Sequence, residues 1–212
     1  MRIGVIGTGN VGSVLGELWV RAGHEVVLSS RHPERLKELA LKLGERAIAG
    51  TPHQAALAGQ VVLLAIPLKG IRELSREISA ELRGKVVLNA CNPIPEKDGE
   101  IALEAMRSGQ GTAVWAAPLF PGSRMVRAFN SVPSDHLRKD AHKKKDPIGI
   151  PVASDDPGAL EVACLLIHDA GFEPVVTGGL ASAKMYEPGT AYWPKAIPAE
   201  RLSELLSPRR AA

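Results

Sequence analysis

A glycine motif near the start of the chain constrains the fold more than any other feature. Gly7, Gly9 and Gly12 form the pattern G-x-G-x-x-G, between the apolar run 3–6 and a segment, 11–22, in which apolar residues recur at helical spacing. In such a strand–turn–helix unit the first glycine permits a tight turn, the second lets a pyrophosphate approach the backbone, and the third allows close helix packing. The motif predicts a dinucleotide-binding unit, with an ordinary glycine-rich turn as the alternative.

Short apolar runs and segments of helical period alternate along the rest of the chain. We expect further strands over residues 25–28, 47–49, 61–66, 85–89, 125–130, 151–153 and 174–177, and further helices over residues 33–43, 70–82, 101–108 and 157–170. This alternation predicts the α/β class, in the form of a Rossmann-type, doubly wound, mostly parallel sheet with helices on both faces.

Two regions fall outside this alternation. The charged segment 136–146 is expected to be a surface loop, and prolines after Glu187 interrupt any long helix in the tail. We expect a Rossmann-like domain over residues 1–177 and a short C-terminal helical extension over residues 178–212. A homodimer formed through this extension is one expectation, because its large apolar side chains need cover: Tyr186, Tyr192, Trp193 and Ile197.

Composition excludes several classes of protein. The 212 residues are 45% hydrophobic and 23% charged, which is typical of a globular domain. A net charge of +3 and an aromatic content of 4% do not indicate nucleic-acid binding. Cys91 and Cys164 lie too far apart in the sequence for a metal-ligand pair or a disulfide framework. No signal-peptide pattern and no apolar run near the ~20 residues of a membrane helix occur, so we expect a cytoplasmic protein.

The end of the second expected strand indicates which dinucleotide binds. An NAD site usually has a carboxylate there for the ribose 2′-hydroxyl, but this chain has Ser30, Arg31 and His32. Arg31 and Ser30 can bind a 2′-phosphate, and Arg35 can add a second cation. Two charge-assisted hydrogen bonds predict a preference for NADP(H) over NAD(H) of at least ~100-fold. A solvated strand end is the alternative.

Three other strand ends are expected at the same edge of the sheet, where ligands of such folds bind. Ile66 and Pro67 would contact the middle of the cofactor, and the amide of Asn130 could meet the nicotinamide carboxamide. Cys91 lies in the third segment, 89–93, as a packed thiol rather than a reactive one. Each segment could instead simply end a strand.

Taken together, segments 5–12, 30–31, 65–67, 92–93 and 127–131 resemble one known family. It is the NADPH-dependent coenzyme F-420 reductase family, also called F-420-dependent NADP oxidoreductases, with the NADPH-oxidising domain of the STEAP metalloreductases as a related branch. The resemblance covers roughly residues 1–187. It implies pyrophosphate contacts from Thr8, Gly9, Asn10 and Val11, 2′-phosphate contacts from Ser30, Arg31 and Arg35, and a nicotinamide end near Ile66 and Ala128.

The resemblance also implies hydride transfer between NADPH and a small-molecule acceptor, coenzyme F-420 or a flavin such as FMN or FAD. Such transfer needs stacked rings rather than a nucleophile, so we name no catalytic residue and no metal site. An NADPH-dependent flavin or ferric reductase and a non-catalytic NADP(H)-binding redox sensor are the alternatives. Asn89 stands where relatives often have Asp, and the tail lacks their long apolar helix. Lysines 143–145 could steer an anionic acceptor or simply be solvated.

Overall fold

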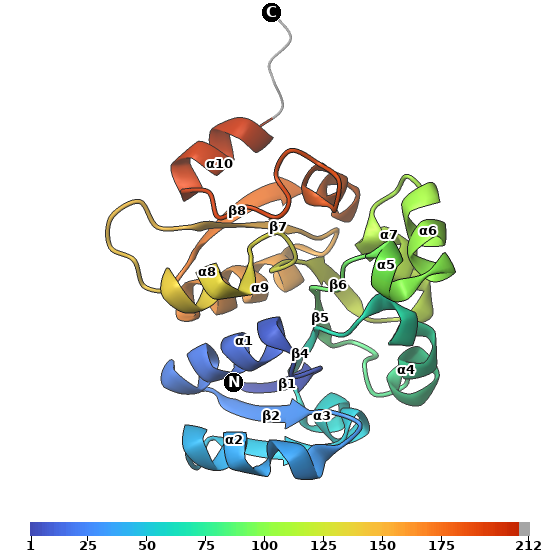
Figure 1. Ribbon diagram of the computed structural model, residues 1–212, viewed down its shortest axis with the longest axis vertical. Coiled ribbons are helices and arrows are strands. Elements are labelled where there is room, and N and C mark those ends of the chain that lie inside the picture. The colour runs from blue at the N-terminus through green and yellow to red at the C-terminus, as the bar shows by residue number, and fades with distance from the viewer. Residues whose placement is uncertain (208–212) are drawn as a thin grey trace, which may run out of the picture.

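Eight strands form one sheet in the computed structural model, which describes residues 1–207 (Figure 1). The strands are Arg2–Ile6 (β1), Glu25–Ser29 (β2), Ala47–Gly50 (β3), Val61–Leu64 (β4), Val86–Asn89 (β5), Arg124–Arg127 (β6), Gly149–Ala153 (β7) and Glu173–Gly178 (β8). Their order is β3-β2-β1-β4-β5-β6-β7-β8. Strands β1 to β6 are parallel, whereas β7 is antiparallel to β6 and parallel to β8. The predicted Rossmann-type, mostly parallel sheet is confirmed.

Helices cover both faces of this sheet. They are Asn10–Arg21 (α1), Lys37–Leu43 (α2), Pro52–Ala58 (α3), Ile71–Ile78 (α4), Pro95–Asp98 (α5), Glu100–Arg107 (α6), Thr112–Ala116 (α7), Ser134–Lys139 (α8), Pro157–Asp169 (α9) and Ala199–Leu206 (α10). One core cluster joins one sheet face to α1, α2, α8 and α9, and a second joins the opposite face to α3, α4, α6 and α7. Because both faces are covered, the central strands are apolar without alternation.

Strand β4 shows how this two-sided burial arises from the sequence. Val61 and Leu63 belong to the first core cluster, while Val62 and Leu64 belong to the second. Successive side chains of a strand point to opposite faces, so an unbroken apolar run fills both cores at once. All four residues are almost completely buried.

Several expected boundaries are wrong. The strand expected over 61–66 ends at Leu64, three residues before Pro67, and the strand expected over 125–130 ends at Arg127, because Phe129 has a φ of +60°. Helix α4 ends at Ile78 rather than Leu82.

Short helices account for most of the other differences. Part of the loop expected over 136–146 is helix α8, Ser134–Lys139. Helix α3 was not expected, although Thr51 and Gln54 form a capping box around it and Pro52 occupies its first turn. Helix α7 was also missed, and at five residues it is too short to show a period of 3.6.

The segment after β8 folds back onto β7 and β8. It contains a 3₁₀ helix, Leu180–Tyr186, and helix α10. A third core cluster lies between it and the two strands, with Tyr186 completely buried and Tyr192 and Ile197 packed against it. The chain itself therefore supplies the cover for which we expected a second copy. Residues 208–212 of the expected extension lie outside the described residues.

Across residues 1–207, none of the helices combines the length and the apolar character required to cross a membrane.

Candidate functional site

Two of the three motif glycines are required by close packing at the end of β1. Gly7 has a φ of +94°, and a Cβ on it would lie 2.4 Å from the carbonyl oxygen of Ala65. A Cβ on Gly12 would lie 1.9 Å from the carbonyl oxygen of Gly7. These contacts bring the first turn of α1 against the tips of β1 and β4, so no larger residue fits at either position.

Gly9 has a different environment. A Cβ on Gly9 would meet no atom within 4 Å, and its φ of −73° and ψ of −161° are open to any residue. Gly9 is the N-cap of α1, and no side chain caps this helix end. The first N–H groups of a helix lack intrahelical partners and carry a partial positive charge. The exposed turn at Gly9 and Asn10 is thus suited to an anion.

The end of β2 lies beside this turn. The N–H of Gly7 donates to the carbonyl oxygen of Ser29 at 3.2 Å, and the Thr8 hydroxyl donates to the same oxygen at 3.5 Å. Arg31 and Arg35 follow Ser29 and are exposed. Within residues 1–207, neither guanidinium makes an ion pair or a side-chain hydrogen bond. A half-buried Ser30 accepts a hydrogen bond from the His32 N–H at 2.9 Å.

Beyond β4, the loop with Ile66 and Pro67 is fastened to the loop after β5. The buried carboxylate of Asp98 accepts hydrogen bonds from the N–H groups of Lys69 and Ile94, both at 3.1 Å. Ile66 is half-buried and Pro67 is exposed at the same edge of the sheet as the glycine motif. Asp98 therefore holds in place the loop that we expect to meet the middle of the cofactor.

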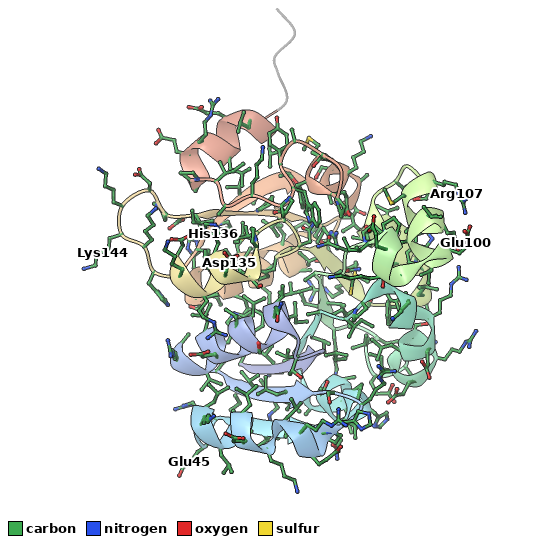
Figure 2. All side chains as sticks on the ribbon, viewed as in Figure 1. Glu45, Glu100, Arg107, Asp135, His136 and Lys144 are labelled. Carbon is green, nitrogen blue, oxygen red and sulfur yellow. The ribbon has the colours of Figure 1, made fainter. Side chains whose placement is uncertain are left out.

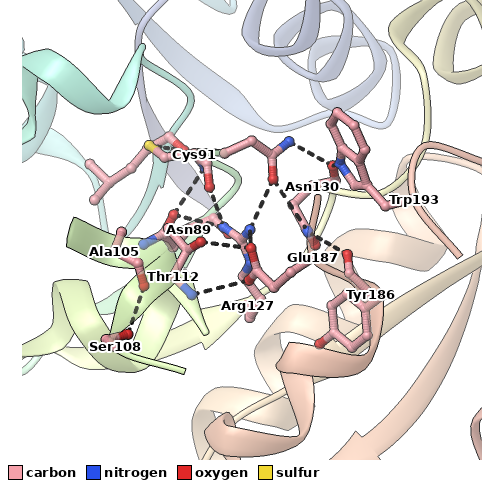
Figure 3. Close-up of polar contacts among 12 residues, drawn as sticks. Asn89, Cys91, Ala105, Ser108, Thr112, Arg127, Asn130, Tyr186, Glu187 and Trp193 are labelled. Carbon is pink, nitrogen blue, oxygen red and sulfur yellow. Dashed lines mark hydrogen bonds and ion pairs between the residues drawn. The ribbon is translucent and has the colours of Figure 1, made fainter. Parts of the chain in front are cut away.

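A buried arginine connects the ends of β5 and β6 (Figure 3). Arg127 has no exposed surface. Its Nη1 donates to the carbonyl oxygen of Cys91 at 2.5 Å and to Oδ1 of Asn89 at 3.2 Å, while Nη2 donates to Oδ1 of Asn92 at 3.0 Å. Nη2 also forms an ion pair with Glu187 Oε2 at 2.9 Å.

Thr112 completes this network from the other side. Its hydroxyl donates to Oε2 of Glu187 at 2.6 Å, and its N–H donates to Oε1 at 3.3 Å. The network thus joins two strand ends, the start of α7 and the C-terminal extension. Beside it, Thr112, Lys184 and Glu187 are among the residues that line a cavity of about 220 Å³ between α6–α7 and the extension.

Asn130 lies next to the same network and has its amide oriented by its partners (Figure 3). Its Nδ2 donates to the carbonyl oxygen of Tyr186 at 3.0 Å. A carbonyl only accepts hydrogen bonds, so the other amide atom of this buried residue is Oδ1, which finds no partner among residues 1–207. Ala128 is completely buried in the first core cluster, so its side chain supports this turn rather than lining its surface.

Cys91 is a packed thiol, as expected. It is 1% exposed, and its Sγ donates to the carbonyl oxygen of Leu64 at 3.5 Å. Burial raises the pKa of the Cys91 thiol to about 11, so the thiol stays neutral near pH 7. A neutral thiol is a poor nucleophile.

The lysine loop lies far from this site, which argues against steering. The N–H of His142 donates to the carbonyl oxygen of Gly171 at 2.8 Å. Close to Gly171, Asp169 pairs at 2.9 Å with His24, which follows the last turn of α1. The loop is therefore beside the opposite end of α1 from the glycine motif, a separation of about 18 Å along the helix. Figure 1 shows the lysine loop at the left of the molecule, whereas strand β2 ends toward the right. Figure 2 labels Lys144 at the outer side of the loop.

Sequence reasoning missed the Arg127–Glu187 pair as a site feature. Arg127 was quoted only as part of a family motif, and Glu187 only as the start of the tail. An arginine in an apolar strand indicates that a buried partner exists. The sequence does not show which carboxylate is that partner, because Glu187 lies 60 positions after Arg127.

Comparisons with known proteins agree with this geometry. The sequence model of a family described as "NADP oxidoreductase coenzyme F420-dependent" matches residues 2–93. The chain is 32% identical over 203 residues to the F420-dependent NADP reductase of Methanothermobacter thermautotrophicus, covering 88% of this chain and 85% of that one. It is 25% identical over 189 residues to the metalloreductase STEAP3 of Rattus norvegicus, covering 88% of this chain but only 36% of the relative.

A solved structure is similar along nearly its whole length. The hypothetical protein SMa0349 from Sinorhizobium meliloti superposes with a TM-score of 0.81 at 25% identity, covering 93% of this chain and 95% of that one.

Proposed function

Because this chain belongs to the F-420-dependent NADP reductase family, we propose that it transfers hydride between NADP(H) and the deazaflavin ring of coenzyme F-420. Family membership makes the chain an NADP(H)-dependent oxidoreductase. The acceptor, the residues that bind each part of the cofactor and the direction of transfer are the proposed parts.

One observation carries the proposal: Gly9 has room for a side chain but has none. Gly7 and Gly12 are fixed by contacts of 2.4 Å and 1.9 Å, whereas no atom of residues 1–207 would lie within 4 Å of a Cβ at position 9. A pyrophosphate at the uncapped start of α1 would use that space and hydrogen-bond the N–H groups there. The residues present therefore fit a dinucleotide.

The side chains around this turn suit NADP(H) rather than NAD(H). Arg31 and Arg35 are exposed cations beside the glycine turn, and Ser29 through His32 include no carboxylate. Thr8, Asn10 and Val11 flank the pyrophosphate position, and Ser30 lies beside the expected 2′-phosphate. Arginine binds phosphate through two parallel hydrogen bonds, so Arg31 is the residue that we expect to carry most of the selectivity.

The remaining residues position the reactive end. When bound, NADPH supplies the hydride from its nicotinamide ring. Ile66 and Pro67 provide an apolar surface that keeps water from the middle of the cofactor. We propose that the nicotinamide carboxamide lies against the turn after β6 that contains Asn130, whose buried amide is held by the Tyr186 carbonyl. We propose that residues 1–177 hold the nucleotide and that the extension, with the cavity beside Glu187, borders the acceptor.

A single assay tests the proposal and its alternatives. Purified protein with NADPH is mixed with coenzyme F-420, with FMN or FAD, or with ferric chelate and FMN, and the nicotinamide absorbance band is followed. Oxidation that depends on F-420 is the expected result. Oxidation of NADPH with flavin but not with F-420 would identify flavin as the acceptor. Saturable NADPH binding without turnover would indicate a sensor. Absence of NADPH binding would contradict the function altogether.

A cytoplasmic location and a homodimer stay predictions. Tyr186, one of the apolar residues that suggested a dimer, is buried within the chain, and Tyr192 and Ile197 pack against the same core cluster. Light scattering would measure the mass in solution and decide between monomer and dimer.

A further inference from the structure

A strained turn follows β6 and separates the two residues that we predicted at the nicotinamide end, Ala128 and Asn130. Phe129, between Ala128 and Asn130, has a φ of +60°, a conformation that a bulky residue rarely adopts. Its ring is buried and meets Trp19 edge-on, with 5.9 Å between centroids and an interplanar angle of 83°. Strain of this kind persists only where the surroundings fix it, and it often marks a functional site.

The C-terminal extension fixes the residue that follows the strained one. The carbonyl oxygen of Asn130 accepts hydrogen bonds from Trp193 Nε1 at 2.9 Å and from Asn92 Nδ2 at 2.8 Å. The neighbouring Ser131 carbonyl oxygen accepts from the N–H of Lys195 at 2.8 Å. The amide of Asn130 also bonds Tyr186, so the extension contacts both the main chain and the side chain of Asn130 (Figure 3).

We propose that Trp193 is a positioning residue for the nicotinamide half of the cofactor, acting through Asn130. Its indole N–H holds the Asn130 carbonyl, and this fixes the strained backbone of the turn at residues 128–130, which we expect beside the nicotinamide. The inference rests on the proposed function, since it needs a nicotinamide at this edge. It gives the extension an indirect role in cofactor binding, through the turn that follows β6.

The geometry limits the effect to one end of the cofactor. Trp193 contacts Asn130 at the end of β6, whereas Gly9 and Arg31 lie at the ends of β1 and β2. Strands β4 and β5 separate these two positions in the sheet. A change at Trp193 should thus leave the adenosine half of the cofactor bound as before.

The test compares NADP⁺ with 2′-phospho-ADP-ribose, which lacks only the nicotinamide. Trp193→Phe removes the N–H donor and keeps an aromatic ring. Tyr192→Phe is the matched control, because its hydroxyl makes only a 3.5 Å hydrogen bond to the Leu205 carbonyl in the same extension. Calorimetry should show NADP⁺ affinity reduced about threefold to tenfold in Trp193→Phe, with the affinity for 2′-phospho-ADP-ribose unchanged. Both affinities should be unchanged in Tyr192→Phe.

A double-mutant cycle separates positioning from general loosening. Asn130→Ala removes the amide bond to the Tyr186 carbonyl and should also weaken NADP⁺ binding. The double variant should lose less than the sum of the two single losses, because both bonds hold the same turn. Equal losses for NADP⁺ and the fragment, additive losses in the double variant, or no loss in Trp193→Phe would each overturn the inference while leaving the proposed function intact. If the wild type binds neither ligand, the proposed function fails and takes this inference with it.

Discussion

Nη2 of Arg127 and Oε2 of Glu187 lie 2.9 Å apart, although 60 residues separate them in the sequence. The arginine side chain is completely buried and the glutamate side chain is 11% exposed. Removing one partner of a buried pair leaves an uncompensated charge in a low-dielectric environment. Glu187→Gln should therefore lower the free energy of unfolding by about 3 kcal/mol, as measured by urea denaturation.

The matched control is Glu100→Gln, which breaks the exposed pair of Glu100 with Arg107. An exposed pair contributes little, so the control should stay within about 0.5 kcal/mol of the wild type. An equally small effect for Glu187→Gln would mean that the network does not hold the extension to the sheet.

Gly9 and Gly12 should respond in opposite ways to the same substitution. A methyl group on Gly12 would collide with the Gly7 carbonyl oxygen, so Gly12→Ala should destabilise the fold by several kcal/mol. A methyl group on Gly9 meets no atom of residues 1–207 within 4 Å. The urea midpoint of Gly9→Ala should therefore equal that of the wild type. Gly9→Ala should nevertheless bind NADPH at least about tenfold more weakly, because the methyl group occupies the pyrophosphate position.

Urea denaturation and NADPH titration of both variants check this contrast. Wild-type affinity in Gly9→Ala would show that no phosphate approaches the backbone there.

The nucleotide half of the fold could be predicted from the sequence because its signals are local. The glycine motif, the apolar run before it and the spacing of Val14, Leu15 and Leu18 all lie within 20 residues. Such a unit needs no distant contact to be identified. The same applies to Arg31, whose position follows directly from the end of β2.

The second half depends on contacts that the sequence does not display. The end of β6 is followed by a positive φ at Phe129, and a positive φ at a phenylalanine has no sequence signature. The Arg127–Glu187 pair and the clamp of Trp193 on Asn130 join segments 60 and 63 residues apart. Tertiary packing also removes part of our reason to expect a dimer, since Tyr186 is buried within its own chain.

Cys91 should resist thiol reagents in the native protein. Its pKa is raised to about 11 by burial and it is 1% exposed, so at pH 8 both the thiolate fraction and access are small. In a Cys164→Ser background, which leaves Cys91 as the single thiol, a disulfide-exchange dye should react slowly in buffer and fast in denaturing urea. Rapid reaction in buffer would reopen a catalytic role for Cys91.

The ion pair of Asp156 with Arg124 should make stability depend on pH in the acid range. Hydrogen bonds from Arg124 and from the Ala159 N–H hold the pKa of the Asp156 carboxyl well below its usual range. A group whose pKa is lowered on folding contributes stability above its unfolded pKa, about 3.9, and this is lost as pH falls through its folded pKa.

Asp156→Asn should therefore reduce the loss of stability between about pH 5 and pH 2. The urea midpoint across that range measures it. Asp135→Asn, at an exposed aspartate without an ion pair among residues 1–207, should keep the wild-type slope. If the urea midpoint of Asp156→Asn falls with pH as steeply as that of the wild type, the ion pair does not contribute to stability in this way.

Calorimetric titration with NADPH and NADH shows whether this chain holds NADP(H) through the turn at Gly9 and the guanidinium of Arg31. The wild type should bind NADPH at least ~100-fold more tightly than NADH. Arg31→Ala should lose most of that preference through weaker NADPH binding, with NADH affinity nearly unchanged. Equal affinities of the wild type for the two coenzymes, or equal losses for both in Arg31→Ala, would contradict the account.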